Sequence, residues 1–292
     1  MREQNVKFES GGETIIGNLF LPTGKPIGAI VTTGPLTSVK EQVTAAYAKA
    51  MAARGYAALA FDHRYFGESG GTPRQFENPT AKIEDIKSAV SFFEGNSETQ
   101  GLPVFAVGIC AGGGYMAGAV AADPRLSAFA GIAGVYTDLA QTKMWMGAGF
   151  DTALTRAEAA EKQWRETGTT ETIPAVAAGN GDVAMPLDEA YVYYGTPRGA
   201  VPNYVNGFAI MSRAHTLMFD AQIAAPGITV PTVIIHSKKA LAPSLAHKFY
   251  GALEARKQEL WLSSQGQIDF YDDPVLINTV SDAAHGLFQS TT

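Results

Sequence analysis

The feature that most constrains the fold of this chain is a repeated alternation of short apolar runs with longer amphipathic stretches. GAIVTTG (28–34), YAALAFD (56–62) and PVFAVGIC (103–110) are apolar or β-branched almost throughout, and each is followed by a stretch with helical spacing. A strand that is apolar on both faces must be buried on both, and a parallel sheet covered by helices provides that burial. We therefore predict an α/β chain with a mostly parallel sheet.

The alternation is interrupted once. Segment 137–225 contains helix-like pieces and irregular sequence punctuated by Gly and Pro, and strand–helix alternation resumes with PTVIIHS (231–237). Because a compact domain rarely leaves so long a stretch loose, we expect an inserted lid over one end of the sheet. The predicted organisation is a core formed by 1–136 and 226–292, with 137–225 as the lid segment.

Composition excludes several classes of protein. The 292 residues carry a net charge of −6, without a basic patch for nucleic acid or an apolar run long enough to cross a membrane. The first ten residues, MREQNVKFES, lack the apolar run of a secretion signal, and the single cysteine cannot form an internal disulfide. We expect a cytoplasmic protein. The five histidines are scattered and have no cysteine partners, so we expect no metal site, and we expect no cofactor.

The single cysteine lies in Gly108-Ile109-Cys110-Ala111-Gly112, between a predicted strand and a helix of small residues. A Gly-x-nucleophile-x-Gly sequence in that context makes a sharp turn that raises the nucleophile above the sheet. The amides that begin the helix would then point at Cys110, and we expect them to lower the pKa of its thiol. The alternative is that Cys110 is a small buried apolar residue.

With these residues the chain resembles the α/β-hydrolase fold and, within it, the dienelactone-hydrolase-like proteins with a cysteine nucleophile. FDHRYFGESGG (61–71) is similar to the motif after the family's fourth strand, and GPLTSVKEQ (34–42) occupies the place of its oxyanion loop. The resemblance implies an eight-stranded, mostly parallel sheet flanked by helices, with the inserted lid after the sixth strand. It also implies an oxyanion hole made by the N–H groups of Leu36 and Ala111, and a contact between Glu41 and the thiol.

The sequence departs from the family where the acid and the histidine of the triad are expected. Lys238 stands at the position of the acid, and Gln267 stands where the histidine usually falls. Because glutamine cannot accept a proton, an ordinary triad cannot operate from position 267. We expect the missing groups among four residues near strand ends or in the lid: His236, His63, Asp138 and His215.

Aromatic residues are concentrated in the inserted segment. They either form a small core of the lid itself or wall the substrate pocket, which would suit a medium-sized, partly apolar acyl or aryl substrate. The residues predicted to bind the substrate are Trp145, Phe150, Tyr194, Tyr204, His215 and Gln267.

These observations favour a cofactor-free hydrolase that attacks an ester, lactone or thioester through Cys110. The absent histidine leaves open an acyltransferase or cyclase that uses the same acyl-enzyme. A non-catalytic binder of small ligands is a third reading, because it would tolerate an incomplete triad. The sequence leaves the substrate and the oligomeric state undecided, with a homodimer among the open assemblies.

Overall fold

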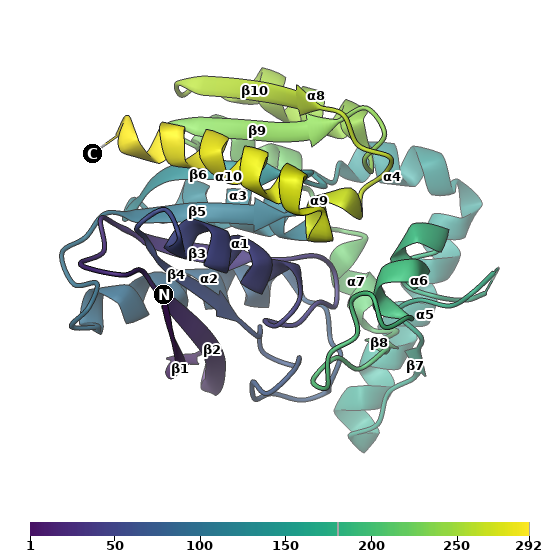
Figure 1. Ribbon diagram of the computed structural model, residues 1–292. Coiled ribbons are helices and arrows are strands. Elements are labelled where there is room, and N and C mark those ends of the chain that lie inside the picture. The colour runs from purple at the N-terminus through teal and green to yellow at the C-terminus, as the bar shows by residue number, and fades with distance from the viewer. Residues whose placement is uncertain (180, 292) are drawn as a thin grey trace.

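The computed structural model describes residues 1–179 and 181–291, and an eight-stranded sheet forms its centre (Figure 1). The strand order is β1-β2-β4-β3-β5-β6-β9-β10. In this order, the strands from β4 to β10 run parallel, and β1 and β2 form an antiparallel hairpin at one edge. The predicted fold class is thereby confirmed. The sheet strands are β1 (Arg2–Ser10), β2 (Glu13–Leu21), β3 (Ala29–Thr33), β4 (Ala57–Phe61), β5 (Val104–Ile109), β6 (Leu126–Ile132), β9 (Thr232–Ser237) and β10 (Lys257–Leu262).

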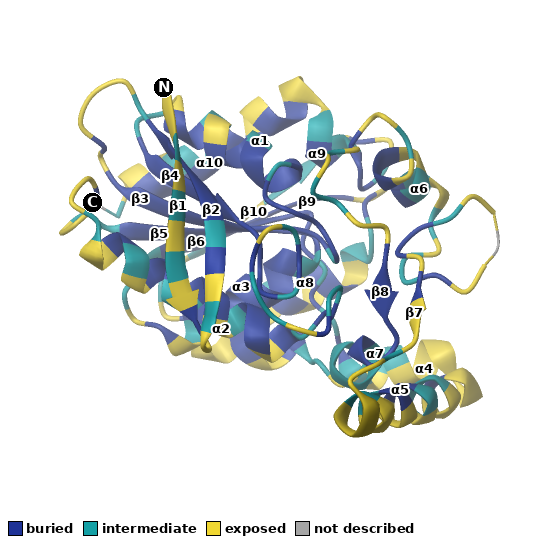
Figure 2. Cartoon of the chain, turned by 90° about the horizontal axis from the view of Figure 1, so that it is seen from below, coloured by how far each residue is buried: buried dark blue, intermediate teal, exposed yellow. Residues whose placement is uncertain are grey.

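Helices cover both faces of the sheet and create two apolar cores, as expected for strands that are apolar on both sides. The first core lies under α1 (Val43–Ala52) and α10 (Pro274–Gln289). The second lies under α2 (Pro79–Gly95), α3 (Ala111–Ala122) and α8 (Pro243–Ala252). Figure 2 shows the result, in which the central strands are buried and the outer faces of the helices are exposed.

The carboxyl ends of four neighbouring strands meet at one edge of the sheet. Thr33 of β3 pairs with Gly108 of β5, and Ile132 of β6 pairs with both Ile109 of β5 and Ile235 of β9. In open parallel sheets, ligands bind outside this edge, because the loops that follow the strands converge there. The loops after β3, β5, β6 and β9 are therefore the place to look for a site.

The segment between β6 and β9 adds no strand to the main sheet. It forms a small apolar cluster with Phe76, around β7 (Thr172–Ile173) and β8 (Phe208–Ala209), and it lies at the carboxyl edge of the sheet (Figure 1). In the described part of the chain, no helix combines the length and the apolarity needed to cross a membrane. The helices of this segment are α4 (Leu139–Met146), α5 (Ala148–Thr167), α6 (Asp188–Tyr194), α7 (Ser212–Thr216) and a 3-10 helix, η1 (Ala221–Gly227). A last short helix, α9 (Asp269–Asp272), follows β10.

Candidate active site

Cys110 occupies the sharp turn between β5 and α3. Its backbone has φ 56° and ψ −127°, a conformation that a non-glycine residue adopts only when its surroundings impose it. The turn is held by its own backbone, since the Cys110 N–H donates to Ile132 at 3.1 Å and the Cys110 carbonyl accepts from Val135 at 2.8 Å. The side chain is thereby fixed at the carboxyl edge of the sheet.

The two glycines that flank this turn are required by close backbone contacts. A Cβ at Gly112 would lie 2.6 Å from the carbonyl oxygens of both Thr33 and Gly34, and one at Gly108 would lie 2.6 Å from the carbonyl of Gly112. Backbone atoms cannot yield as a flexible side chain can, so a side chain at Gly112 would push α3 away from β3, and one at Gly108 would push α3 away from β5. The motif is thus explained by packing as well as by the turn.

The surroundings of the Cys110 thiol correct one expectation. Burial raises the pKa of the thiol, and this effect outweighs the opposite influence of Tyr271, the Ala111 N–H and Gln267, which interact with the sulfur. The nearby charge of Glu189 raises this pKa further. The prediction of a lowered pKa is therefore wrong, because desolvation exceeds the effect of the helix amides. The thiol needs a proton acceptor.

Leu36 and Ala111 are the residues whose N–H groups were predicted to form an oxyanion hole. Both residues line the same cavity as Cys110, and the Leu36 N–H has no acceptor among the described residues. The next amide, that of Thr37, donates to the buried carboxylate of Glu77 at 3.1 Å. Glu77 in turn forms an ion pair with Lys82 at 2.7 Å. This buried pair fixes the direction of the peptide groups beside the thiol.

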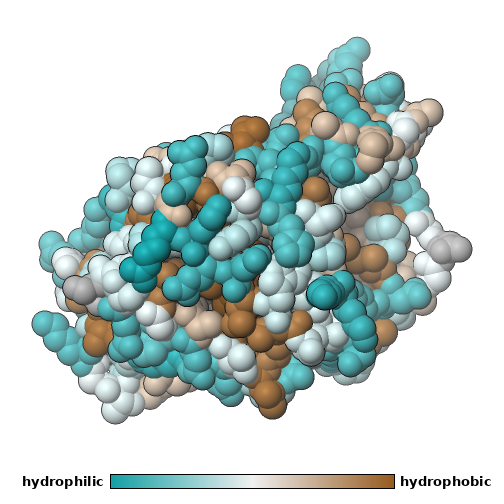
Figure 3. All heavy atoms as spheres, turned by 90° about the horizontal axis from the view of Figure 1, so that it is seen from above, coloured by the Kyte–Doolittle hydropathy of each residue, from teal (hydrophilic) through white to brown (hydrophobic). Residues whose placement is uncertain are grey.

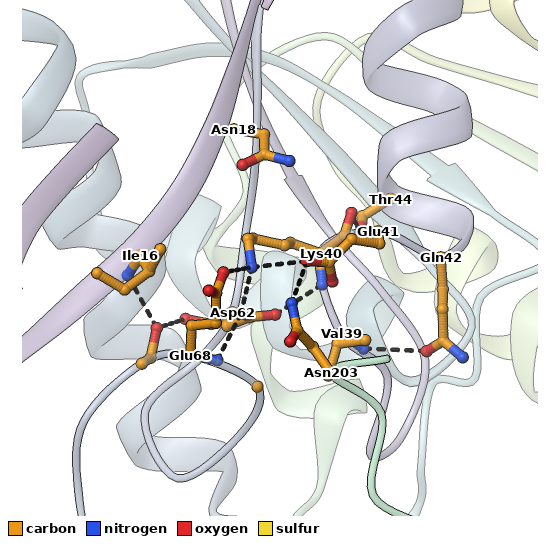
Figure 4. Close-up of polar contacts among 12 residues, drawn as sticks. Ile16, Asn18, Val39, Lys40, Glu41, Gln42, Thr44, Asp62, Glu68 and Asn203 are labelled. Carbon is orange, nitrogen blue, oxygen red and sulfur yellow. Dashed lines mark hydrogen bonds and ion pairs between the residues drawn. The ribbon is translucent and has the colours of Figure 1, made fainter. Parts of the chain in front are cut away.

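A second buried cation, Lys40, holds the rest of the loop 34–42. Figure 4 shows its ammonium among the carboxylates of Asp62, Glu68 and Glu41, and the distance to Asp62 is 2.9 Å. Burial alone would lower the pKa of Lys40, but the carboxylates outweigh it and raise that pKa. Glu41 also accepts a hydrogen bond of 2.6 Å from Asn203, which ties the loop to the inserted segment.

A cavity of about 380 Å³ opens beside Cys110. Its wall combines the sheet-edge loops with the inserted segment, and most of the residues that form it are apolar. By contrast, the face of the molecule in Figure 3 is mostly hydrophilic, with scattered apolar patches. The apolar part of the wall includes Leu36, Val135, Met185, Leu187, Phe219 and Ile268, and the polar part includes Tyr115, Glu189, Tyr194, Gln267 and Tyr271.

Of the residues predicted to bind the substrate, Gln267 and Tyr194 lie on this cavity wall. The Gln267 amide joins two backbone segments, since its Nε2 donates to the Ala133 carbonyl at 2.9 Å and its Oε1 accepts from Leu241 N–H at 2.9 Å. These two bonds hold the loop after β10 in the absence of a histidine. The Tyr194 hydroxyl is buried and has no hydrogen-bond partner among the described residues.

The two histidines at strand ends do not line the cavity. His63 is enclosed between Thr33, at 2.8 Å, and Asp85, at 3.2 Å, and burial is the main reason that its pKa is lowered. His236 is fully buried, its Nδ1–H donates to the Ser237 carbonyl at 2.9 Å, and its ring packs on Trp261; burial lowers its pKa too. Their positions correct the expectation that one of them faces the thiol, because both side chains point into the packed layers beside the sheet.

The predicted acids and the histidine of the inserted segment also lie off the cavity. Asp138 caps α4 and pairs with Lys248, and Glu41 is engaged by Lys40 and Asn203. His215 stands 3.5 Å from Glu161 and packs on Phe76. Each of these side chains is held by local partners, so none faces Cys110.

Three of the predicted aromatic residues are placed elsewhere as well. Trp145 is 59% exposed, and Phe150 is buried beneath Lys143. Tyr204 packs behind Tyr194, with ring centroids 5.2 Å apart, and does not itself line the cavity. Much of the aromatic content of the inserted segment therefore serves its own packing, the alternative that the sequence had left open.

The sequence reasoning missed Glu189, Tyr271 and Tyr115, all of which line the cavity. Tyr271 follows Gln267 by four residues, so helical spacing could have placed the two side chains on one face. Tyr115 likewise lies near the start of the helix that Cys110 precedes. Glu189 had no comparable signal, because its position depends on how the inserted segment folds over the sheet.

The sequence matches the model of a family described as serine aminopeptidase, S33, over residues 37–171. An uncharacterised Pseudomonas aeruginosa protein, PA2218, is 31% identical over 280 residues, which is 89% of this chain and 73% of that protein. The crystal structure of PA2218 has a TM-score of 0.84, with 28% identity, and the match covers 100% of this chain and 94% of the other.

Two further matches are more distant. A thiohydrolase of Eupenicillium brefeldianum is 34% identical over 92 residues, covering 31% of this chain and 30% of the relative. The dienelactone hydrolase of Anabaena variabilis has a TM-score of 0.61 with 15% identity, over 99% of this chain and 98% of the other. The second match bears on the fold alone.

Proposed function

This chain belongs to the α/β-hydrolase family, and we propose that it hydrolyses an ester or thioester through a covalent acyl group on Cys110. One observation carries the proposal. The only cysteine of the chain occupies the turn in which this fold presents its nucleophile, and it lines a mostly apolar cavity. A cysteine kept only for packing would need neither the constrained backbone nor the cavity.

In the first half of the reaction, the sulfur of Cys110 bonds to the acyl carbon and the bond to the leaving group breaks. Negative charge develops on the carbonyl oxygen, and the N–H groups of Leu36 and Ala111 are the donors available to it. The proton of the thiol passes to the leaving group. In the second half, water attacks the thioester carbon, the carbon–sulfur bond breaks, the acid is released, and the sulfur of Cys110 takes a proton from the water to become a thiol again.

The cavity wall favours an uncharged, medium-sized acyl group. About 380 Å³ accommodates a substrate of modest size, and the inserted segment would act as the lid that closes over it. The arginines of the segment are engaged elsewhere, since Arg198 pairs with Asp272 and Arg213 with Asp182. Glu189, which lines the cavity, would repel an anionic substrate. The relative named as a thiohydrolase supports a thioester as one substrate class.

Acyl transfer is the second candidate. Gln267 cannot activate water, so the acyl group could persist long enough to reach an alcohol, amine or thiol. The chemistry of the first half is the same in both cases, and the acceptor alone decides the product.

The test is intact-mass spectrometry after brief mixing with a panel of activated esters and thioesters of short-chain and aryl acids. We expect the wild type to gain one acyl mass that the Cys110→Ala variant does not gain. Cys110→Ser is the matched second variant, because its smaller oxygen nucleophile fits the same turn. The release of free acid, against transfer to an added amine or alcohol, then separates hydrolysis from transfer.

An absence of both adduct and turnover with every donor would overturn the proposal. Ligand binding that persists in Cys110→Ala would then favour a non-catalytic binder. Turnover by Cys110→Ala at the wild-type rate would also overturn it, because another nucleophile would be at work.

A further inference from the structure

The raised pKa of the Cys110 thiol and the neutral Gln267 leave the reaction without an evident proton acceptor. Among the described residues, Glu189 is the only Asp, Glu, His, Lys or Arg on the cavity wall. The tyrosines there do not serve, because burial raises the pKa of Tyr115, Tyr194 and Tyr271 well above the ordinary range. A carboxylate is thus present at one place on the cavity wall.

Glu189 is held over the loop in which the family has its histidine. Its Oε1 accepts from the N–H of Gln267 and its Oε2 from the N–H of Ile268, both at 3.3 Å. The side chain is only partly buried, so water can reach it. Two backbone donors orient the carboxylate while leaving oxygen lone pairs free for a further partner.

A second feature of the chain makes room for this carboxylate. A Cβ at Gly266 would lie 2.1 Å from Oε2 of Glu189, so the absence of a side chain at 266 lets the carboxylate approach the loop. No positive φ requires glycine there. The space that a side chain at position 266 would fill is therefore occupied by Glu189 of α6, which is distant in sequence.

We propose that Glu189 is the catalytic base that activates the attacking water, taking over at the same place the task of the absent histidine. The carboxylate accepts a proton from water as the oxygen bonds to the acyl carbon. The carbon–sulfur bond then breaks, and the proton passes from Glu189 to the departing sulfur of Cys110. This inference rests on the proposed function, because it concerns the second half of that reaction.

The experiment uses a donor with a good leaving group, so that acylation is fast and release of the acyl group limits turnover. In Glu189→Gln we expect turnover to fall about 100-fold or more, since general bases contribute that much, while the acyl adduct on Cys110 accumulates. The neutral amide has almost the same shape as the carboxylate. Asp188→Asn, a change at the exposed neighbour in the same helix, should turn over as the wild type does.

Two further variants distinguish a role of Glu189 in the reaction from a role in holding the loop. Formate should restore acyl release to Glu189→Ala in a saturable manner, because it supplies a carboxylate to the vacated space. Gly266→Ala should displace the tip of Glu189 and slow acyl release. Gly251→Ala, where an added Cβ meets nothing within 4 Å, is its matched control.

The outcomes distinguish this inference from the proposal beneath it. Wild-type turnover with equally fast acyl release in Glu189→Gln would overturn Glu189 as the base and leave the role of Cys110 intact. Slow release that formate cannot restore in Glu189→Ala would also overturn it, and would assign Glu189 a supporting role. If neither the wild type nor Glu189→Gln forms an acyl adduct on Cys110, the proposed function and this inference are overturned together.

Discussion

The two sides of Cys110 are built in different ways. On one side, the loop 34–42 is held by buried ion pairs, Lys40 with Asp62 and Lys82 with Glu77, within the sheet-forming part of the chain. On the other side, the loop after β10 is held by the neutral amide of Gln267 and covered by Glu189 from the inserted segment. The difference suggests that stabilisation of charge on the substrate and transfer of protons belong to separate structural units, which mutations can affect one at a time.

The largest effect is expected from Lys40→Met, on the side held by ion pairs. The ammonium is 1% exposed, so its removal leaves Asp62 buried without its cation. We expect the free energy of unfolding to fall by about 3–5 kcal/mol, as for other broken buried pairs. Urea unfolding measures the loss, with the exposed Lys25→Met as control. A loss similar to that of the control would contradict the distinction between the two sides.

Gly112→Ala tests the turn itself. The new Cβ meets two backbone carbonyls, so we expect a loss of about 1–3 kcal/mol in stability from overpacking. A shift of the Ala111 N–H should also lower turnover about 100-fold, as small misplacements of catalytic groups do. Stability and turnover are measured together, with Gly286→Ala as control because nothing surrounds that position. Unchanged turnover would show that the turn tolerates movement.

Gln267→His returns the residue that the family usually has. We expect no gain in turnover, because the exposed Lys238 follows β9 where an acid would orient the imidazole. We expect stability to fall by about 1–3 kcal/mol, since buried partners at Ala133 and Leu241 lose their bonds. The measurements are the rate of acyl release and urea unfolding. A faster release than in the wild type would show that this side retains a latent histidine site.

The smallest effect concerns acid pH and the buried His236. Burial lowers its pKa in the folded state, so below about pH 6.5 the unfolded chain binds a proton that the folded chain does not. Stability should therefore decrease as the pH falls through that range, by at most about 1.4 kcal/mol per pH unit from this residue. His236→Gln should flatten the dependence in urea unfolding between pH 7 and 5.5, and the half-exposed His247→Gln should not. If the free energy of unfolding depends equally on pH in the wild type, His236→Gln and His247→Gln, the pH dependence does not come from His236.

The fold was predictable because its signals are local. Apolar runs, helical spacing and the glycines around Cys110 act within short stretches, and each predicted strand of the sheet lies where the pattern indicated it. The side chains facing the cavity were less predictable. His63 and His236 are at the expected ends of strands, but rotamer and packing turn them toward Asp85 and Trp261. Asp138 instead caps α4 and pairs with Lys248. Glu189 reaches the site through tertiary contacts of an irregular segment, and no spacing in the sequence reports such a contact.

The backbone conformation of Cys110 also bears on how its chemistry could have arisen. A positive φ costs a non-glycine residue roughly 1–3 kcal/mol, and the cost comes from the Cβ, which serine and cysteine share. The turn therefore distinguishes poorly between the two nucleophiles. A single codon change can exchange them without disturbing the scaffold, while the groups that handle protons must be rebuilt elsewhere in the gene. A lineage can thus change its nucleophile first and adapt its acid–base partners afterwards.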